Sequence, residues 1–413
     1  MSIVVQKYGG SSVADVNKIR QVAERVMRTR QAGHEVVVVV SAMGHTTDEL
    51  LALAKQVSAN PDRRELDMLL TTGERVSMAL LSIAIRELGG EAISFTGSQS
   101  GIITNDRHID ARIVEVRPFR VQDELARGKV VVIAGFQGVS YRREVTTLGR
   151  GGSDTTAVAM AAALGAEYCE ICSDVDGVYT ADPRVVTDAR RIGTLSYEET
   201  QELAESGAKV LNAQAVEFAK EKGIAIYARA TASPLPGERG VDPADDGTVV
   251  RRYAPRMPGT VVGVASERDI LTIEVVADPP ASPTPSAQAA FDDFFDLLDR
   301  HGVAGKQLHQ SGSSLTLLVS KDNLHEEGRV RTALTSAYGA SVRITDTLGA
   351  VSVIGAGINQ SFANVRHGVA ALIKAGIAIG GSATSSFRIT WLVDRPRIDD
   401  AVRALHADLI DRG

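Results

Sequence analysis

Over residues 1–232, short apolar runs alternate with stretches of helical periodicity. Residues 36–40 are five consecutive valines, and residues 130–134 and 224–228 are similarly apolar. Unbroken runs of this kind are typical of strands buried on both faces of a parallel sheet. Residues 19–27 instead place apolar side chains at helical spacing, with charged residues on the other face. The alternation predicts an α/β domain with a mainly parallel central sheet.

The pattern changes after residue 232. Nine of the 13 prolines lie between residues 234 and 285, and residues 233–259 show little periodicity, which predicts a linker. Shorter elements follow, with strands at 270–276, 314–320, 341–347, 350–354 and 387–393 and helices at 289–298, 330–337, 364–375 and 397–409. Their order resembles two βαββαβ units. The predicted domains are 1–232, a linker at 233–259, and a C-terminal region at 260–413 that divides into units at 260–345 and 346–413.

The 413 residues carry a net charge of -6, with a pI near 5.8. A nucleic-acid-binding protein would usually present a basic patch or stripe, so this class is disfavoured. The N-terminus lacks the basic and apolar regions of a signal peptide. No uninterrupted apolar run reaches the about 20 residues that span a bilayer. We therefore predict a cytoplasmic protein without a membrane segment.

The two cysteines, Cys169 and Cys172, have the C-x-x-C spacing of redox and metal sites. Residues 168–175 look like a strand, however, and side chains three residues apart on a strand point to opposite faces. A zinc site would also need further ligands. We interpret the pair as structural thiols.

Residues 7–12, Lys-Tyr-Gly-Gly-Ser-Ser, lie between the first predicted strand and the first predicted helix. Glycines let the backbone approach a phosphate closely, and a helix start offers free N–H groups to an anion. Lys7 adds a charge that can stabilise a transferred phosphoryl group. The spacing matches neither the Walker A nor the dinucleotide fingerprint. Taken alone, the segment fits a phosphate site and a simple tight turn equally well.

A second turn, at residues 41–48, follows the valine strand directly. Ligands of open α/β sheets lie beyond the carboxyl ends of the strands. The hydroxyls of this turn can bind a carboxylate or a phosphate there. The alternative is that Thr46 or Thr47 caps the next helix.

A third turn, at residues 147–154, places Arg150 among three glycines. A guanidinium group can hold a carboxylate with two hydrogen bonds. Asp154 stands at the start of the next predicted helix, where it could act as an ordinary cap. Capping would not explain the arginine among the glycines.

Two more segments carry candidate chemistry. Glu74, next to Gly73, suits an ammonium group, and its alternative is a solvated glutamate at a helix start. Residues 173–184 form a dense turn segment with acidic, aromatic and arginine side chains that could hold a nucleotide. An ordinary polar loop is the alternative for that segment.

Together these segments closely resemble the aspartate kinases of the amino-acid-kinase family. Their motif sequences are most similar to those of enzymes of the actinobacterial type. The resemblance covers residues 1–232 and rests on several motifs in one order, at residues 7–12, 40–44, 72–74, 136–138, 146–156, 173–184 and 209–211. It implies an amino-acid-kinase-like sandwich that uses ATP and Mg²⁺ to convert L-aspartate into 4-phospho-L-aspartate. This reaction opens the pathway to lysine, threonine and methionine.

The resemblance also implies a role for each matching residue. Lys7 would contact the transferring phosphate, and Asp154 would orient Lys7 or the reacting groups. Glu74 would hold the substrate ammonium and Arg150 its α-carboxylate. The rest of the substrate pocket would be Ser41, Thr47 and Ser153. The nucleotide site would comprise Lys7, Gly9, Gly10, Ser173, Asp174, Tyr179, Arg184, Lys209 and Val210.

Residues 262–276 and 351–357 resemble paired ACT modules, the ferredoxin-like α+β units with which this family senses amino acids. Such modules usually place a Pro-Gly turn before the ligand-facing helix, and neither residues 277–283 nor residues 359–364 contain one. We expect the ACT fold to be kept and feedback control to be weak or altered, with Gln310 and Asn359 as candidate effector contacts. ACT modules commonly pair across subunits, which implies a homo-oligomer.

Two other functions stay open. A kinase for another amino acid, such as glutamate, would also use Glu74 and Arg150, because these residues recognise only the α-amino and α-carboxylate groups. A protein that binds nucleotides without turnover is the second alternative. The presence of Lys7, Arg150 and Asp154 argues against it.

Overall fold

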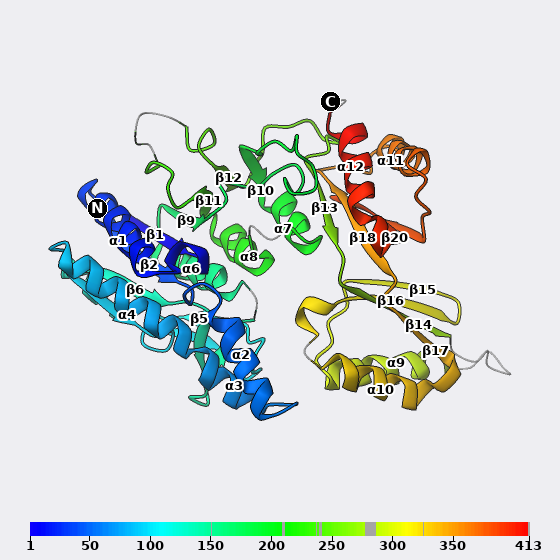
Figure 1. The fold of residues 1–413 in the computed structure, drawn as a ribbon, viewed down its shortest axis with the longest axis horizontal. Coiled ribbons are helices and arrows are strands. Elements are labelled where there is room, and N and C mark those ends of the chain that lie inside the picture. Colours follow the sequence, from blue (N-terminus) through cyan, green and yellow to red (C-terminus); the bar gives the residue numbers. More distant parts are fainter. Residues whose placement is uncertain are drawn as a thin grey trace. The chain divides into compact units, whose positions relative to one another are not determined.

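The structure is a computed structural model. It describes residues 1–149, 151–208, 211–236, 238, 242–276, 286–324 and 326–411, apart from the side chains of 286–290 and 323. The chain forms two compact units (Figure 1). Unit 1 comprises Met1–Thr180 and Asp188–Met257, and unit 2 comprises Ala181–Thr187 and Pro258–Gly413.

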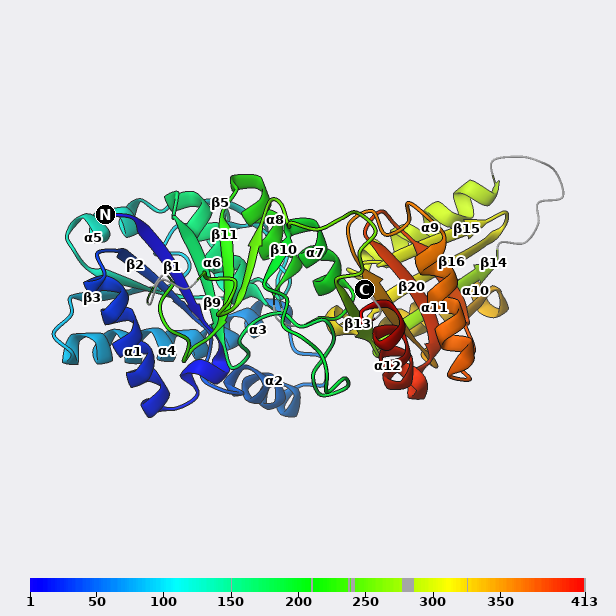
Figure 2. The same cartoon turned by 90° about the horizontal axis from the view of Figure 1, so that it is seen from above.

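Unit 1 is built on an eight-stranded sheet (Figure 2). Its order is β10 (Thr194–Ser196), β12 (Thr248–Arg251), β11 (Ala225–Ala230), β9 (Tyr168–Ser173), β1 (Ile3–Tyr8), β2 (Glu35–Val40), β6 (Val130–Ala134) and β3 (Ala92–Phe95). Every neighbouring pair is parallel except β11 with β12. The predicted mainly parallel sheet is therefore confirmed.

Helices cover both faces of this sheet. The helices of unit 1 are α1 (Val16–Gln31), α2 (Thr46–Val57), α3 (Arg63–Leu70), α4 (Thr72–Glu87), α5 (Phe119–Ala126), α6 (Gly152–Leu164), α7 (Tyr197–Glu205) and α8 (Ala213–Lys222). The alternate valines Val36, Val38 and Val40 belong to one apolar core with α1 and α4. Helix α6 contacts β1, β2 and β9 without joining that core, and Val37 and Val39 are also fully buried. Burial on both sides explains the unbroken valine run.

A smaller sheet lies beside the main one in unit 1. Its order is β5 (Ile113–Val116), β4 (Ile102–Thr104), β7 (Gln137–Ser140) and β8 (Val145–Thr147). The short 3-10 helix η1 (Gly10–Val13) follows β1. Strand β8 leads directly toward the start of α6, so this sheet positions the third glycine-rich turn.

Unit 2 contains two four-stranded sheets, each with two helices. The first has the order β15 (Gln307–Ser311), β16 (Ser314–Ser320), β14 (Ile270–Val276) and β17 (Val342–Thr345), with α9 (Ser286–Arg300) and α10 (Glu327–Tyr338). The second has the order β13 (Gly263–Glu267), β18 (Leu348–Ile354), β20 (Arg388–Asp394) and β19 (Gly381–Thr384), with α11 (Ala363–Lys374) and α12 (Ile398–Leu409). These are the two predicted ACT-type modules.

The predicted domain boundaries differ from the structure in three places. Residues Ala181–Thr187 lie within the predicted first domain but belong to unit 2. The predicted linker at 233–259 contains β12, which pairs with β10 and β11 in the main sheet, so the first unit extends to Met257. Thr248, Val249 and Val250 are buried and Arg251 is exposed, but the prolines and glycines around this short run hide its strand pattern. Strand β13 pairs with β18 of the second module, because β16 and β17 already occupy both edges of β14.

Helices α3 and α4 form one nearly continuous segment, Arg63–Glu87. Within the described ranges, it is the single helical stretch long and apolar enough to cross a membrane by length and composition. The sequence analysis did not find it, because Asp67, Glu74 and Arg75 interrupt the apolar run. Helix α4 packs against α1, β2, β3 and β6 and buries Leu81 and Ile85 completely. This packing is that of a core helix.

A buried ion pair crosses the centre of unit 1. Glu170 in β9 is 0% exposed, and its Oε1 lies 2.6 Å from an Arg25 guanidinium nitrogen in α1. The amide of Gln6 in β1 donates to Glu170 Oε2 at 2.9 Å. Arg229 in β11 is also buried, with its Nε 3.9 Å from the same carboxylate. Glu170 thus compensates cations from two other elements.

We predict that Glu170→Gln lowers the free energy of unfolding by about 3–5 kcal/mol, because it leaves buried guanidinium charges uncompensated. The measurement is the urea midpoint followed by far-UV circular dichroism. Glu65→Gln removes one of two carboxylate partners of Arg64 at an exposed site and should change the stability by less than about 0.5 kcal/mol. Equal midpoints for the two variants would contradict the assignment.

Candidate active site

Lys7 and Asp154 form an ion pair at the carboxyl edge of the main sheet. The Nζ of Lys7 in β1 lies 2.7 Å from Oδ1 of Asp154 in the first turn of α6, and the two side chains are 12% and 10% exposed. The residue that caps α6 is Gly151, which has no side chain to offer. Asp154 therefore pairs with the lysine and is not the cap of this helix. The helix start and Lys7 together favour an anion at this point.

The first two glycine-rich turns lie in direct contact. The backbone N–H of Gly44 donates to the carbonyl of Gly10 at 3.0 Å, and that of Gly9 donates to the carbonyl of Cys172 at 3.2 Å. A Cβ at Gly10 would lie 2.9 Å from the Gly44 oxygen and 3.0 Å from the Ala42 oxygen. This closeness requires glycine at residue 10 and joins the carboxyl ends of β1, β2 and β9.

Ser41 lies on the second turn, and Thr47 lies in the first turn of helix α2. The N–H of Ser41 continues the sheet by donating to the Tyr8 carbonyl at 3.1 Å. The residue that caps α2 is His45, which makes no side-chain capping bond, and Thr46 donates to the Met43 carbonyl at 2.7 Å. The alternative interpretation, in which Thr46 or Thr47 caps this helix, is therefore wrong. Ser41 and Thr47 are both half-buried.

Glu74, near the start of α4, is 2% exposed. Its Oε1 accepts a hydrogen bond from the Ala42 N–H at 3.1 Å, while Oε2 is buried with no hydrogen-bond partner among the residues that the structure describes. Burial raises the pKa of this carboxyl to about 7, against the lowering effect of backbone hydrogen bonds. The alternative of a solvated glutamate is excluded. A buried carboxylate with one unused oxygen is suited to a bound cation such as an ammonium group.

The third turn leads into α6. Gly149 and Gly151 both have left-handed backbones, with φ of 74° and 72°, and Arg150 between them lies outside the described residues. Ser153 is 7% exposed, and a Cβ at Gly135 would lie 2.8 Å from its side chain, so the end of β6 touches this turn closely. Phe136 has a φ of 66°, which is uncommon for a non-glycine residue. Residues with such strained backbones cluster at functional sites.

Thr231 and Ser12 connect the proposed nucleotide segment to the first glycine-rich turn. Thr231, after β11, donates its N–H to the Ser173 carbonyl at 2.8 Å, and its hydroxyl lies 2.7 Å from that of Ser12. Tyr179 donates to Asp176 at 2.8 Å, and Asp174 is exposed.

Three further residues of the predicted nucleotide site, Arg184, Lys209 and Val210, stay predictions. Arg184 belongs to unit 2, where its guanidinium lies 2.7 Å from the Asp182 carboxylate. Lys209 and Val210 lie outside the described residues.

Both cysteines are buried in β9 as free thiols.

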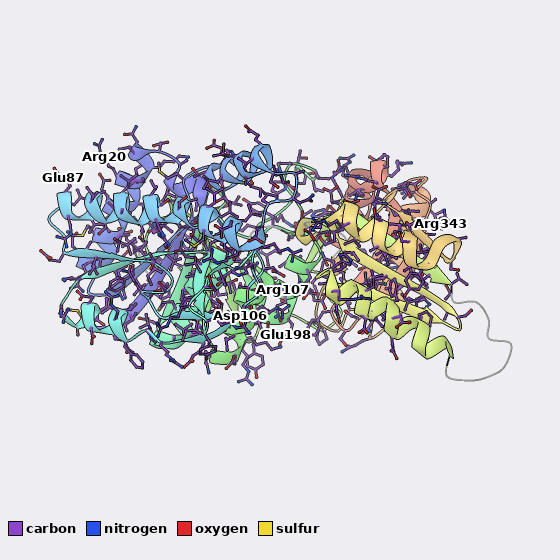
Figure 3. All side chains as sticks on the ribbon, turned by 90° about the horizontal axis from the view of Figure 1, so that it is seen from below. Arg20, Glu87, Asp106, Arg107, Glu198 and Arg343 are labelled. Atoms are coloured by element: carbon purple, nitrogen blue, oxygen red, sulfur yellow. The ribbon has the colours of Figure 1, made fainter. Side chains whose placement is uncertain are left out.

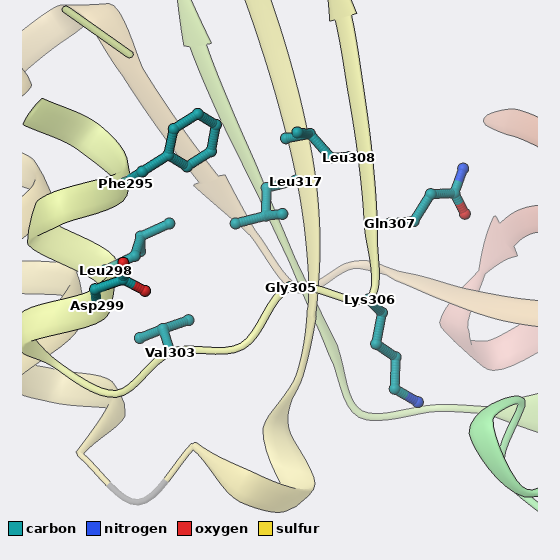
Figure 4. Close-up of a pocket in the computed structure, with 9 residues that line it drawn as sticks. All are labelled: Phe295, Leu298, Asp299, Val303, Gly305, Lys306, Gln307, Leu308 and Leu317. Atoms are coloured by element: carbon teal, nitrogen blue, oxygen red, sulfur yellow. The ribbon is translucent and has the colours of Figure 1, made fainter. Parts of the chain in front are cut away.

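Unit 2 holds a pocket of about 340 Å³ in its first module (Figure 4). It lies between α9 and the strands β15 and β16, with Phe295, Leu298 and Leu317 on its apolar side. The candidate effector residue Gln310 is exposed on β15 and does not line this pocket, and Asn359 is exposed before α11. The segment 277–283, which lacks the Pro-Gly turn, lies outside the described residues.

The sequence analysis missed Asp67 and gave Gln137 no role of its own. Asp67 is completely buried in α3, and the Gln137 amide donates to the Thr71 carbonyl at 3.1 Å. Asp67, Thr71 and Glu74 follow the spacing i, i+4, i+7, so these polar residues share one helix face. That spacing was the available signal. Across the described ranges, no group of three or more His, Cys, Asp or Glu side chains could hold a metal ion.

Comparison with known proteins identifies the family. The amino acid kinase family matches residues 2–228. The chain thus belongs to the amino acid kinase family. It is 46% identical to the aspartokinase of Mycolicibacterium smegmatis, over 98% of this chain and 96% of that one, and 44% identical to the aspartokinase of Mycobacterium tuberculosis strain H37Rv with the same coverage. Within the family, the chain therefore belongs to the aspartokinases.

The fold is also similar to that of a solved aspartokinase. The crystal structure of E. coli aspartokinase III in complex with aspartate and ADP, in the R-state, superposes with a TM-score of 0.85. It covers 98% of this chain and 99% of the other, at 24% identity. The likeness therefore extends through both units and confirms the two-part fold.

We predict that Glu74→Gln stabilises the ligand-free protein, and increasingly so as the pH rises. The pKa of Glu74 is raised in the folded state, so the wild type loses stability as the carboxyl ionises between its ordinary value of 4.5 and about 7. Glutamine does not ionise. The difference in unfolding free energy should therefore grow between about pH 5 and about pH 8, toward roughly 3 kcal/mol.

Melting temperatures at the two pH values test this prediction. Glu65→Gln, at an exposed position of α3, is the matched control and should show no pH-dependent difference of this size. A Glu74→Gln difference that stays constant with pH would mean that the carboxyl ionises as freely as an exposed one.

Proposed function

We propose that this chain transfers the γ-phosphoryl group of ATP to the β-carboxylate of L-aspartate, giving ADP and 4-phospho-L-aspartate. The observation that carries the proposal is Glu74, a buried carboxylate whose unused oxygen suits the ammonium of an amino acid. It lies in a member of the aspartokinases. The attacking carboxylate is already ionised at neutral pH, so the reaction needs no general base.

Lys7 acts on the transferring phosphoryl group. Its ammonium and the start of α6 supply positive charge where negative charge spreads over the phosphoryl oxygens. The Asp154 carboxylate lies 2.7 Å from the Lys7 ammonium and orients it at the carboxyl edge of the sheet. Gly9 and Gly10 let the backbone approach the phosphates without a side chain between them.

Mg²⁺ fits this site as a partner of the nucleotide phosphates. Such ions are usually held by one or two carboxylates together with substrate phosphates, and Asp154, beside Lys7, is a carboxylate that could serve. When bound, the ion neutralises phosphate charge. The chain itself supplies the lysine and the backbone N–H groups.

Aspartate would lie between Glu74 and the start of α6. Glu74 takes its ammonium, Arg150 its α-carboxylate, and Ser41, Thr47 and Ser153 complete the pocket. The nucleotide would contact Ser173, Asp174, Tyr179, Lys209 and Val210. Arg184, the remaining residue of the predicted nucleotide site, would contact the nucleotide as well.

Three broader features belong to the proposal. The enzyme is cytoplasmic, it assembles as a homo-oligomer through its ACT-type modules, and its feedback control is weak or altered. The last point rests on the second module, where Asn364 donates to the carbonyls of Ile358 and Gly259 at 3.1 and 3.0 Å. These bonds close the turn before α11 in place of a Pro-Gly step.

Release of ADP from ATP and Mg²⁺ tests the activity. We expect turnover with L-aspartate and little with L-glutamate. Lys7→Ala should lower kcat by about 10²- to 10³-fold, while Lys55→Ala, an exposed change on α2, should leave it unaltered. No aspartate-dependent turnover in a protein that binds ATP would favour the nucleotide-binding alternative, and turnover on glutamate would favour the sister kinase.

The regulatory proposal has its own measurement. Added lysine or threonine should leave aspartate-dependent ADP release unchanged, and calorimetry should detect no tight binding of either. Strong inhibition by one of them would show that the missing Pro-Gly turns do not abolish the effector site, while the kinase assignment would stand.

A further inference from the structure

One face of the helical segment α3–α4 is polar and completely enclosed. Asp67, Thr71 and Glu74 are 0%, 0% and 2% exposed. Their spacing of four and then three residues places them in line, and a helix rise of 1.5 Å per residue separates the two carboxylates along the axis by about 10 Å. A buried carboxylate is costly unless hydrogen bonds compensate it. Glu74 lacks that compensation at one oxygen, whereas Asp67 has it in full.

The Asp67 carboxylate receives bonds from three other residues. The hydroxyl of Thr147 donates to Oδ1 at 2.6 Å, and the N–H of Ile109 lies 3.1 Å from Oδ1 and 3.3 Å from Oδ2. The ring Nδ1 of His108 is 2.6 Å from Oδ2. Asp67 thus joins α3 to the end of β8 and to the turn at residues 108–110. The exposed neighbours Asp106 and Arg107, labelled in Figure 3, lead into this turn.

The turn that Asp67 holds has a strained backbone. Ile109 has a φ of 72°, in the left-handed region that β-branched residues avoid. The same turn contacts the start of the third glycine-rich turn, because a Cβ at Gly149 would lie 3.1 Å from Asp110 Oδ1 and 3.5 Å from the Ile109 carbonyl. The N–H of Ala111 donates to the Thr147 carbonyl at 2.8 Å. Strain of this kind persists only where surrounding contacts enforce it.

The other end of the polar face reaches the opposite side of the site. Glu74 accepts from Ala42 on the second turn, at 3.1 Å. Between the two carboxylates, the Thr71 carbonyl accepts from the Gln137 amide at 3.1 Å, which attaches the middle of the segment to β7. One stiff helical segment therefore contacts both turns between which the substrate would lie.

We propose that Asp67 is a positioning residue for aspartate recognition, which sets the spacing between Glu74 and the turn that leads from β8 into α6. The inference rests on the proposed function, which puts the substrate between these two groups. Asp67 does not touch the substrate. It acts by holding Thr147 and the Ile109 turn against Gly149, so that an amino acid meets its ammonium and carboxylate partners at a fixed separation.

Steady-state kinetics on the full chain test this proposal. Asp67→Ala should raise the KM for aspartate roughly 10- to 100-fold, because displacements of about 1 Å at a binding group are enough to cost that much. The KM for ATP should change by less than about twofold, since Asp67 contacts nothing on the nucleotide side. Asp67→Asn should restore a KM for aspartate near that of the wild type, because the amide oxygen can still accept from Ile109 and Thr147.

Asp62→Ala is the matched control. It removes the N-cap of the same helix, where Asp62 accepts from the N–H groups of Arg64 and Glu65, and it does not reach the Ile109 turn. It should leave both KM values unchanged. If Asp67→Ala does not fold, Thr147→Val removes a single bond to the same carboxylate and should raise the KM for aspartate alone.

The alternatives separate cleanly. Equal rises in both KM values, an Asp62→Ala protein that behaves like Asp67→Ala, or a folded Asp67→Ala protein with an unaltered KM for aspartate would each overturn the positioning role. A wild type without aspartate-dependent turnover would refute the proposed function, and this inference with it.

Discussion

The ion pair between Lys7 and Asp154 fixes the distance between the central strand β1 and the first turn of α6, and the candidate site is arranged around it. Both groups are about nine-tenths removed from solvent. Replacing a buried ion pair by apolar residues often leaves stability unchanged or higher, so stability alone does not account for this one. In the proposed function, a negatively charged ligand meets the lysine and the helix start together.

The buried carboxyl of Glu74 makes the chemistry of the candidate site depend on pH. Its raised pKa means that the buried carboxylate ionises at a cost when no cation is present. An ammonium group would supply the missing partner, and the ionised form would then be favoured. In the proposed function, substrate binding is linked to proton release from this residue, because the ammonium group and the proton compete for the same carboxylate.

Local pattern was sufficient to predict much of the fold. Five valines in a row imply burial on both faces, and Lys7, Glu74 and Asp154 each stand beside a glycine-rich turn. The features that could not be predicted depend on distant partners. Strand β12 is four residues among prolines, and the pairing of β13 depends on which strand edges other segments leave open. The hydrogen bonds of Asp67 to His108 and Thr147 could not be predicted, because these partners are far away in sequence.

The pairing of β13 with β18 makes the first ACT-type module an insertion inside the second. In that ladder Glu267 lies opposite Ala350, so the chain departs and returns at the same point of the second sheet. Inserted domains are tolerated where their two ends lie close together. The intervening segment can therefore lengthen, shorten or diverge during evolution without breaking the ladder that encloses it. A sensor for a new metabolite could arise there while the second module keeps its own architecture.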